Sequence, residues 1–131
     1  MKRRICIVQS TYNNHITYPM IEIAAKELRI NKINSFKVLK VPGSFEIPQA
    51  ISRIIKKYDG FIAIGCIIKG QTKNFDLISS AITSGIMHLS IQNKKPIGNA
   101  IITSFNEKQA LKRKKNAKEA AKAVIEVLKN S

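Results

Sequence analysis

The segment GCIIKGQTKN, residues 65–74, combines residue types that can hold an anion. An apolar run ends here, and the polar residues after it predict a helix that begins near Thr72. The first N–H groups of a helix and its positive end bind phosphates, and Lys69 adds a positive charge. Thr72 could donate its hydroxyl to a phosphate oxygen, or it could serve only as an ordinary N-cap. Both interpretations stay open, because the segment lacks a complete P-loop pattern.

Two further segments carry residues suited to binding a small molecule. In VPGSFEIP, residues 41–48, Gly43 lets the backbone approach a ligand closely, and Glu46 could either accept ligand hydrogen bonds or complement a helix dipole. In TYNN, residues 11–14, Tyr12 offers a ring on which a planar heterocycle could stack, although a half-buried tyrosine is the plainer interpretation. His15, which follows, is either catalytic or a surface residue.

Apolar runs that alternate with amphipathic segments must position these residues. Short runs rich in Ile, Val and Phe predict strands at 4–9, 35–41, 60–68 and 97–103. Helical spacing is clearest from Ile47 to Ile55, from Phe75 to Leu89 and from Ala117 to Leu128, and SFNE at 104–107 has the spacing of a capping box. This βα alternation predicts a parallel sheet between two helical layers, an α/β three-layer sandwich. Ligands bind at the carboxyl ends of such strands, where all three segments fall.

Length and composition favour one compact domain spanning residues 1–131. Hydrophobic residues make up 44% of the 131 residues, and no apolar run approaches the roughly 20 residues that cross a bilayer. The N-terminus resembles a strand more than an export signal, so we expect a cytoplasmic protein with no membrane partner. Cys6 and Cys66 both fall in predicted buried strands, which favours reduced thiols and no metal site.

The formal net charge of +15 attracts anions such as phosphates or nucleic acid. The alternative is a lysine-rich composition whose charges only cover a solvated surface. The basic run LKRKK, residues 111–115, has no aromatic residues among its charges. We therefore expect no nucleic-acid partner despite the charge.

Four blocks together resemble the lumazine synthase family, over nearly the whole chain: PGSFEIP, GCIIKGQTKNFD, PIGNAIIT and QALKR. The resemblance implies a flavodoxin-like, four-stranded parallel sheet flanked by helices. It implies a transferase of riboflavin biosynthesis that condenses 5-amino-6-(ribitylamino)uracil with 3,4-dihydroxy-2-butanone 4-phosphate. The product is 6,7-dimethyl-8-ribityllumazine, and no metal or organic cofactor takes part. Active sites in this family lie between subunits of a homopentamer, and some members build hollow shells from twelve pentamers.

The resemblance also assigns roles to individual residues. An aromatic ring stacks on the pyrimidine, a strand end contacts it through backbone atoms, one loop holds the ribityl chain, and a turn holds the phosphate. Two positions act across the subunit interface. Tyr12, followed by Asn13, matches the stacking ring, and the strand end is matched by Cys66, Ile67 and Ile68. The ribityl loop is matched by Gly43, Ser44 and Glu46, and the phosphate turn by Gln71 and Thr72. Asn99 and the phosphate-binding Arg113 match the two positions that act across the interface.

Position 74 departs from the family pattern, which has a histidine that transfers protons where this chain has Asn74. Asparagine forms hydrogen bonds but exchanges no proton near neutral pH, and general acid–base catalysis contributes about 10²–10⁴-fold where it applies. The nucleophile is the substrate's own amine, so Asn74 predicts a slower enzyme rather than an inactive one. His15 or Lys73 could compensate.

A second departure follows Arg113, where the family's Gly-containing segment of several residues is reduced to Lys114 before a helix-compatible run. That segment lies near the contacts between pentamers, so its loss favours an isolated pentamer over a shell.

Three hypotheses remain: an active transferase, a non-catalytic relative that binds lumazine or flavin as an assembly protein, and a basic nucleic-acid-binding module. Asn74 supports the second. The third leaves the pocket motifs unexplained.

Overall fold

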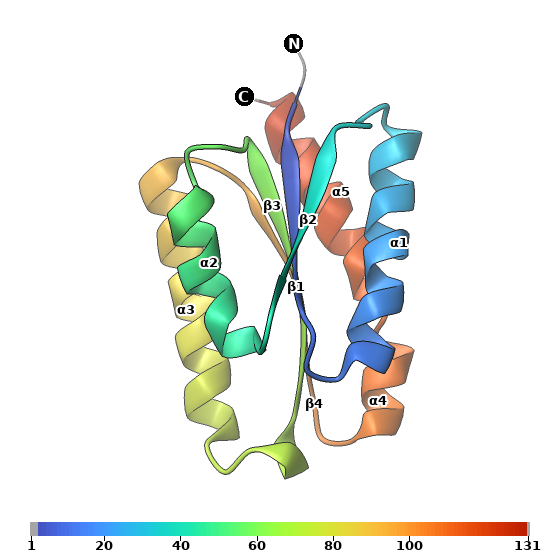
Figure 1. Cartoon of the computed structure of the whole chain (residues 1–131), viewed down its shortest axis with the longest axis vertical. Helices are drawn as coiled ribbons and strands as arrows, with labels where there is room; N and C mark the ends of the chain where they lie inside the picture. Colours follow the sequence, from blue (N-terminus) through green and yellow to red (C-terminus); the bar gives the residue numbers. More distant parts are fainter. Residues whose placement is uncertain (1–2, 131) are drawn as a thin grey trace.

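The computed structural model describes residues 3–130 and contains one parallel four-stranded sheet of order β2-β1-β3-β4 (Figure 1). The flavodoxin-like α/β fold expected from the sequence is confirmed. The strands are β1 (Ile5–Ser10), β2 (Phe36–Val41), β3 (Gly60–Ile68) and β4 (Ile97–Ser104). The α-helices are α1 (Asn14–Ile30), α2 (Ile47–Ile54), α3 (Phe75–Asn93), α4 (Glu107–Lys112) and α5 (Asn116–Lys129), with 3-10 turns at Ser44–Glu46 and Lys69–Gln71.

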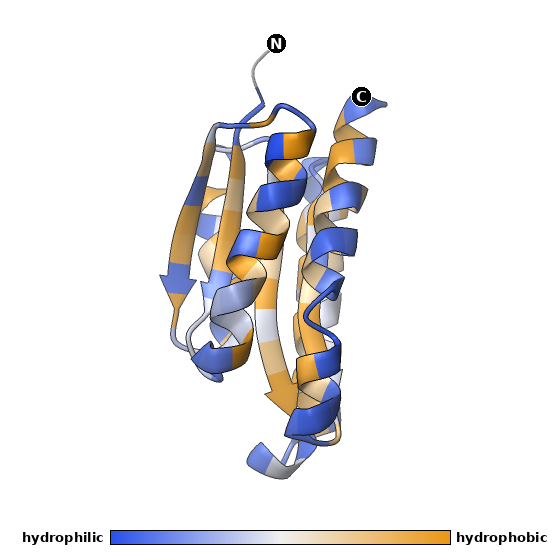
Figure 2. Ribbon diagram, turned by 90° about the vertical axis from the view of Figure 1, so that its right-hand side faces the viewer, coloured by the Kyte–Doolittle hydropathy of each residue, from blue (hydrophilic) through white to orange (hydrophobic). Residues whose placement is uncertain are grey.

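Helices cover both faces of the sheet, which makes three layers. Helices α1, α4 and α5 lie on one face and α2 and α3 on the other (Figure 1). Hydrophobic and hydrophilic bands alternate along α1 and α5 (Figure 2), as expected of helices that bury one stripe. All nine residues of β3 are buried, because this central strand is covered on both faces.

The predicted strand boundaries hold to within one residue at each end, and β3 matches fully. The predicted start of α3 is wrong. Thr72 has an extended backbone, and the helix begins at Phe75 with Asn74 as its N-cap. Gln71 ends a separate 3-10 turn.

The predicted capping box at 104–107 is also displaced. Ser104 is the last residue of β4, and Asn106 is the N-cap of α4, where its side chain accepts from the Gln109 N–H at 2.9 Å. Gln109 Oε1 accepts in turn from the Phe105 N–H at 2.9 Å. The predicted last helix is divided into α4 and α5 by a turn at residues 113–115.

Gly98 allows α5 to pack directly on β4, because a Cβ atom there would lie 2.5 Å from the Ala120 carbonyl oxygen. We expect Gly98→Ala to lower the free energy of unfolding by about 1–3 kcal/mol, the usual cost of overpacking. Gly70→Ala is the matched control, since a Cβ at Gly70 has no atom within 4 Å. Urea unfolding measures both variants, and equal stability of the two would contradict this packing argument.

None of the helices within residues 3–130 is long and apolar enough to cross a membrane.

Candidate active site

A small pocket of about 150 Å³ opens at the carboxyl ends of the strands, as the sequence predicted for the site. Three segments that are distant in sequence meet there: the loop after β1, the loop after β2, and the end of β3 with the turn that follows it. Its lining is Tyr12, Gly43, Ser44, Phe45, Cys66, Ile67, Ile68, Gln71, Thr72 and Ile78. Eight of the twelve expected substrate-binding residues therefore line one pocket. The other four, Asn13, Glu46, Asn99 and Arg113, lie outside the lining and are described below.

Two aromatic rings stand at this pocket with much of their surface exposed. Tyr12 is 56% and Phe45 is 61% exposed, whereas most large apolar residues of the described chain are buried. An exposed ring beside a mostly apolar pocket can stack on a planar ligand. The Tyr12 ring therefore keeps exposed surface on which a ligand could stack. Phe45 was missed as a site residue, although it lies inside the motif that contains Ser44 and Glu46.

The loop after β2 is seated tightly on β3. A Cβ atom at Gly65 would lie 2.3 Å from Ser44 Oγ, so only glycine at 65 leaves room for the loop in this position. Ser44 Oγ is buried and has no hydrogen-bond partner within residues 3–130. A buried hydroxyl on a pocket wall retains an unused hydrogen bond that a ligand could complete.

An amide pair joins the loop after β1 to the turn after β3. Asn13 Nδ2 donates to Gln71 Oε1 at 2.9 Å, and Gln71 Nε2 donates back to Asn13 Oδ1 at 3.3 Å. Asn13 Nδ2 also donates to the Cys66 carbonyl at 3.1 Å. Asn13 has a left-handed backbone with φ of 61°, which asparagine tolerates better than most residues. Although Asn13 does not line the pocket, it links Tyr12, Cys66 and Gln71, which do.

The turn at residues 69–74 keeps the properties of an anion site, with a different geometry from the predicted one. The Thr72 hydroxyl accepts from the Asn74 N–H at 3.4 Å, and no side chain caps the first turn of α3. The ammonium of Lys69 lies 5.4 Å from the centre of the Phe105 ring, which comes from the end of β4. A cation, a hydroxyl and uncapped helical N–H groups therefore gather beside the pocket.

Besides Asn13, four predicted residues do not line the pocket of the single chain. Glu46 ends the 3-10 turn and precedes α2. Asn99 is exposed on β4, and its Oδ1 accepts from the Ile101 N–H at 3.0 Å. Arg113 follows α4, and its Nη1 donates to the Thr103 carbonyl at 2.5 Å. Asn74 is exposed at the start of α3 and lies outside the lining as well.

His15 is paired with the carboxylate of Glu107, and both side chains are more than half exposed. Neither residue lines the pocket, and neither does Lys73. The pairing with Glu107 was not predicted, because it joins residues 92 positions apart in the sequence.

The Cys66 thiol is a poor candidate for a catalytic nucleophile. Burial, together with the negative charge of Glu107, raises the pKa of this thiol from 9.0 to about 11. A thiol with this pKa stays protonated near neutral pH, so it is a poor nucleophile.

The comparisons with known proteins agree in one description. The family model described as 6,7-dimethyl-8-ribityllumazine synthase matches residues 2–131. The protein of that name from Staphylothermus marinus is 39% identical over 132 residues, which cover 98% of this chain and 88% of the relative. Those from Buchnera aphidicola subsp. Baizongia pistaciae and Polaromonas sp. are 43% and 35% identical, covering 86% and 96% of this chain and 74% and 85% of the relatives. This chain belongs to the 6,7-dimethyl-8-ribityllumazine synthase family.

Proposed function

We propose that this protein is a cytoplasmic 6,7-dimethyl-8-ribityllumazine synthase of riboflavin biosynthesis, acting as a single domain over residues 1–131. It condenses 5-amino-6-(ribitylamino)uracil with 3,4-dihydroxy-2-butanone 4-phosphate and releases phosphate and water. The observation that carries the proposal is the pocket at the carboxyl ends of the strands, in a chain of this family. That pocket joins Tyr12, Ser44, the end of β3, Gln71 and Thr72.

The two substrates would occupy different parts of the site. The pyrimidine stacks on Tyr12 and meets the backbone of residues 66–68, and its ribityl chain runs along the loop of residues 43–46. The phosphate of the second substrate lies at Gln71 and Thr72, beside the uncapped start of α3. This arrangement holds an amine of the pyrimidine near the ketone of the butanone.

The chemistry asks little of the protein beyond positioning. One amine attacks the ketone, and water leaves as a C=N bond forms. Loss of a proton from the adjacent carbon lets the phosphate depart with its bonding electrons, and the resulting enol becomes a second carbonyl. The other amine attacks that carbonyl, and a second water leaves as the ring closes. Holding two reactants in register can contribute about 7–11 kcal/mol to the barrier, and positive charge at the phosphate assists its departure. No metal or organic cofactor is needed for these steps.

We propose a homopentamer in which neighbouring chains complete each site. Asn99 and Arg113 lie outside their own chain's pocket, so they are available to the pocket of a neighbour. Helix α3 also exposes Leu77, Met87 and Ile91, and a hollow of about 700 Å³ lies between α3 and Thr103. Exposed apolar side chains beside a hollow are typical of protein interfaces. The turn between α4 and α5 has only residues 113–115, which favours isolated pentamers over a shell.

Incubation of the purified protein with both substrates tests the activity, with the absorbance of the lumazine as the readout. Product formation supports the enzyme. Binding of lumazine without turnover would instead favour the non-catalytic assembly protein. Sedimentation tests the assembly, where a stable monomer would contradict the shared site and a particle of dozens of subunits would contradict the preference for pentamers.

The amide pair between Asn13 and Gln71 should couple the binding of the two substrates. We expect Gln71→Ala and Asn13→Ala each to raise KM for both substrates by about 2- to 10-fold, the effect of one lost hydrogen bond. Because both changes break the same pair, the double variant should lose little more than Asn13→Ala alone. Steady-state kinetics measures all three, and fully additive losses would show that the pair is not a coupling element.

Gln71→Glu is the matched control for that cycle. It keeps an oxygen that accepts from Asn13 Nδ2 and loses the reciprocal donor, but it also adds a negative charge at the proposed phosphate position. Its KM for the pyrimidine should therefore lie between those of the parent protein and Gln71→Ala, whereas its KM for the butanone phosphate should exceed that of Gln71→Ala.

A further inference from the structure

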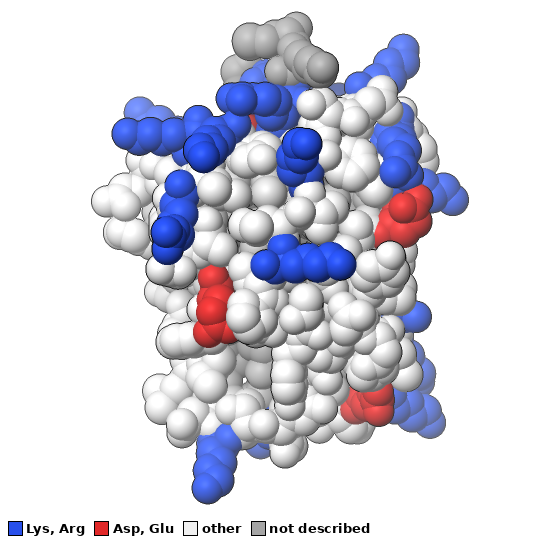
Figure 3. All heavy atoms as spheres, in the orientation of Figure 1, with Lys and Arg blue, Asp and Glu red and all other residues white. Residues whose placement is uncertain are grey.

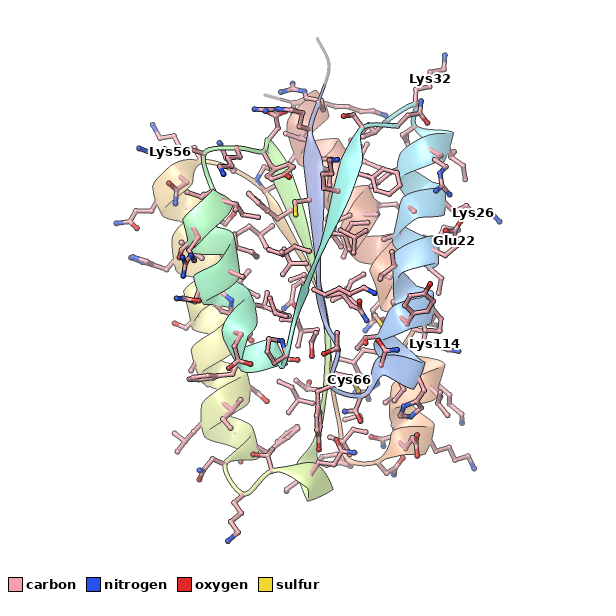
Figure 4. All side chains as sticks on the ribbon, in the orientation of Figure 1. Glu22, Lys26, Lys32, Lys56, Cys66 and Lys114 are labelled. Atoms are coloured by element: carbon pink, nitrogen blue, oxygen red, sulfur yellow. The ribbon has the colours of Figure 1, made fainter. Side chains whose placement is uncertain are left out.

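The topology gathers positive charge at the amino ends of the strands, the edge opposite the pocket. In a parallel sheet with helical crossovers, each connection from a helix to the next strand lies at that edge (Figure 1). These connections read NKINS at 31–35, IKKYD at 55–59 and KKP at 94–96, and Arg3 and Arg4 precede β1. Figure 3 shows Lys and Arg side chains crowded at this end of the molecule, and Figure 4 places Lys32 and Lys56 there, away from Cys66.

Two neighbouring cavities open at this amino edge, and both are lined by cations. One, of about 410 Å³, includes Arg3, Lys32 and Lys129 in its lining. The other, of about 280 Å³, includes Arg4, Lys37 and Lys57. The two share Ser35, and neither lining contains a carboxylate. The cavities thus form one continuous basic surface, which we call the amino-edge surface.

Stabilisation of helix ends explains part of this charge. Lysines near the carboxyl end of a helix complement its dipole, and Arg3 Nη2 donates to the Leu128 carbonyl at 3.0 Å. Lys95 Nζ likewise donates to the Ile55 carbonyl at 2.7 Å. Stabilisation of helix ends does not explain Arg4 and Lys37, which lie at the amino ends of β1 and β2.

The remaining cations of the surface are not neutralised within the described chain. The ion pairs among residues 3–130 are Arg29 with Glu22 and His15 with Glu107, and none of these four residues lines either cavity. Asp59, the one acidic residue in the three connections, accepts from the Arg4 backbone N–H at 2.7 Å. The positive potential is therefore available to an anionic partner.

Against the expectation from the sequence, which considered only the basic run at 111–115, we propose that the amino-edge surface binds the phosphate backbone of single-stranded nucleic acid. A positively charged groove with aromatic side chains is the usual site for such strands, and half-buried Phe36 and Tyr58 line the second cavity. A membrane surface fits less well, since binding there uses one continuous apolar face of a helix. The exposed large apolar residues near this edge, Ile30, Ile91 and Val127, come from the ends of three different helices. The amino-edge surface and the pocket lie at opposite ends of the strands, so binding of nucleic acid is separate from the proposed catalysis.

The test is fluorescence anisotropy of a labelled oligouridylate of about 16 nucleotides, the upper site size of a single binding domain, titrated with the assembled protein across a salt series. We expect log Kd to depend linearly on log salt, because bound phosphates release counterions. Lys37→Gln/Lys57→Gln should weaken binding and reduce the slope by about 1.4, at about 0.7 for each lost phosphate contact. Lys26→Gln/Lys118→Gln makes the same change in net charge on the outer faces of α1 and α5 and should leave the slope unchanged.

Equal losses in the two double variants would overturn the proposal, because the attraction would then come from net charge alone. Absence of oligouridylate binding at low salt would also overturn it, as would tighter binding to vesicles of anionic lipid. Lumazine formation and sedimentation should be unchanged in Lys37→Gln/Lys57→Gln. The result is therefore independent of whether the proposed enzyme activity holds.

Discussion

Replacing Arg113 by alanine should raise KM for the butanone phosphate by about 10- to 150-fold, the effect of losing a hydrogen bond to a charged group. A guanidinium binds phosphate with two parallel N–H groups, so it provides both charge and geometry. Arg113 is exposed at the end of α4, and the one hydrogen bond that its guanidinium makes to the described chain, to the Thr103 carbonyl, leaves other donors free. Steady-state kinetics with each substrate varied in turn measures the effect, and KM for the pyrimidine should change much less.

Two controls sharpen this prediction. Arg113→Lys keeps the charge without the planar fork, so it should have an intermediate KM. Lys115→Ala removes a neighbouring exposed charge and should have little effect.

Mixed assemblies test whether Arg113 acts on a neighbouring subunit. Arg113→Ala and Tyr12→Ala chains, each of low activity alone, should regain activity when they are unfolded and reassembled together. Some sites would then combine an intact Tyr12 from one chain with an intact Arg113 from the next. An unchanged KM in Arg113→Ala would show that the phosphate is held by other groups. A raised KM in that variant with no recovery in the mixture would show that Arg113 acts within its own chain.

Replacing Asn74 by histidine should raise kcat by about tenfold or more, within the usual range for acid–base assistance. The added imidazole would act mainly in the transition state, so KM should change much less. Asn74 is exposed, and its side chain makes no capping hydrogen bond, so the substitution should leave α3 intact. Absorbance of the lumazine product measures both constants.

The pH profile distinguishes proton transfer from a change in binding. The parent protein should vary little in rate between about pH 6 and 8, where an unperturbed imidazole titrates near 6.5. Asn74→His should acquire a dependence in that window. The phosphate substrate ionises with a second pKa of about 6, so its own titration must be measured separately.

His15→Ala and Lys73→Ala are the controls for position 74. Neither residue lines the pocket, and His15 is paired with Glu107, so we expect both variants to keep their activity. If Asn74→His had no effect while one of these variants lost turnover, that residue would be the proton carrier. If neither the parent protein nor Asn74→His formed product although both bound lumazine, the assembly-protein hypothesis would be favoured.

The sequence by itself determined the layered α/β fold and where its strands lie. The buried run at 60–68 reads as a strand because nine consecutive apolar or small residues leave no polar face for an amphipathic helix. The helices between strands predict a parallel arrangement. A parallel sheet brings the loops that contain Tyr12 and Gly43, and the turn after Ile68, to one edge. The family motifs then assigned the residues of those loops.

The sequence by itself did not determine where the helices begin, because several polar residues can cap a helix equally well. Ser104 and Asn106 each have an acceptor of the right type and a partner three residues later. Pairing of β4 with β3 as far as Ser104 with Ile68 leaves the cap to Asn106. Similarly, the extended backbone at Thr72 moves the start of α3 to Phe75.

Only the tertiary structure decided the contacts between residues far apart in the chain. Asn13 and Gln71 are 58 positions apart, and a lone asparagine and a lone glutamine carry no signal that their amides will pair. The tertiary structure also decided where the positive charges gather. In the sequence, the lysines of the three connections look like scattered surface residues, and only the topology brings them to one edge. The physical reason is the same in both cases: hydrophobic spacing encodes which face of an element is buried, whereas long-range polar contacts depend on where the packed elements finally meet.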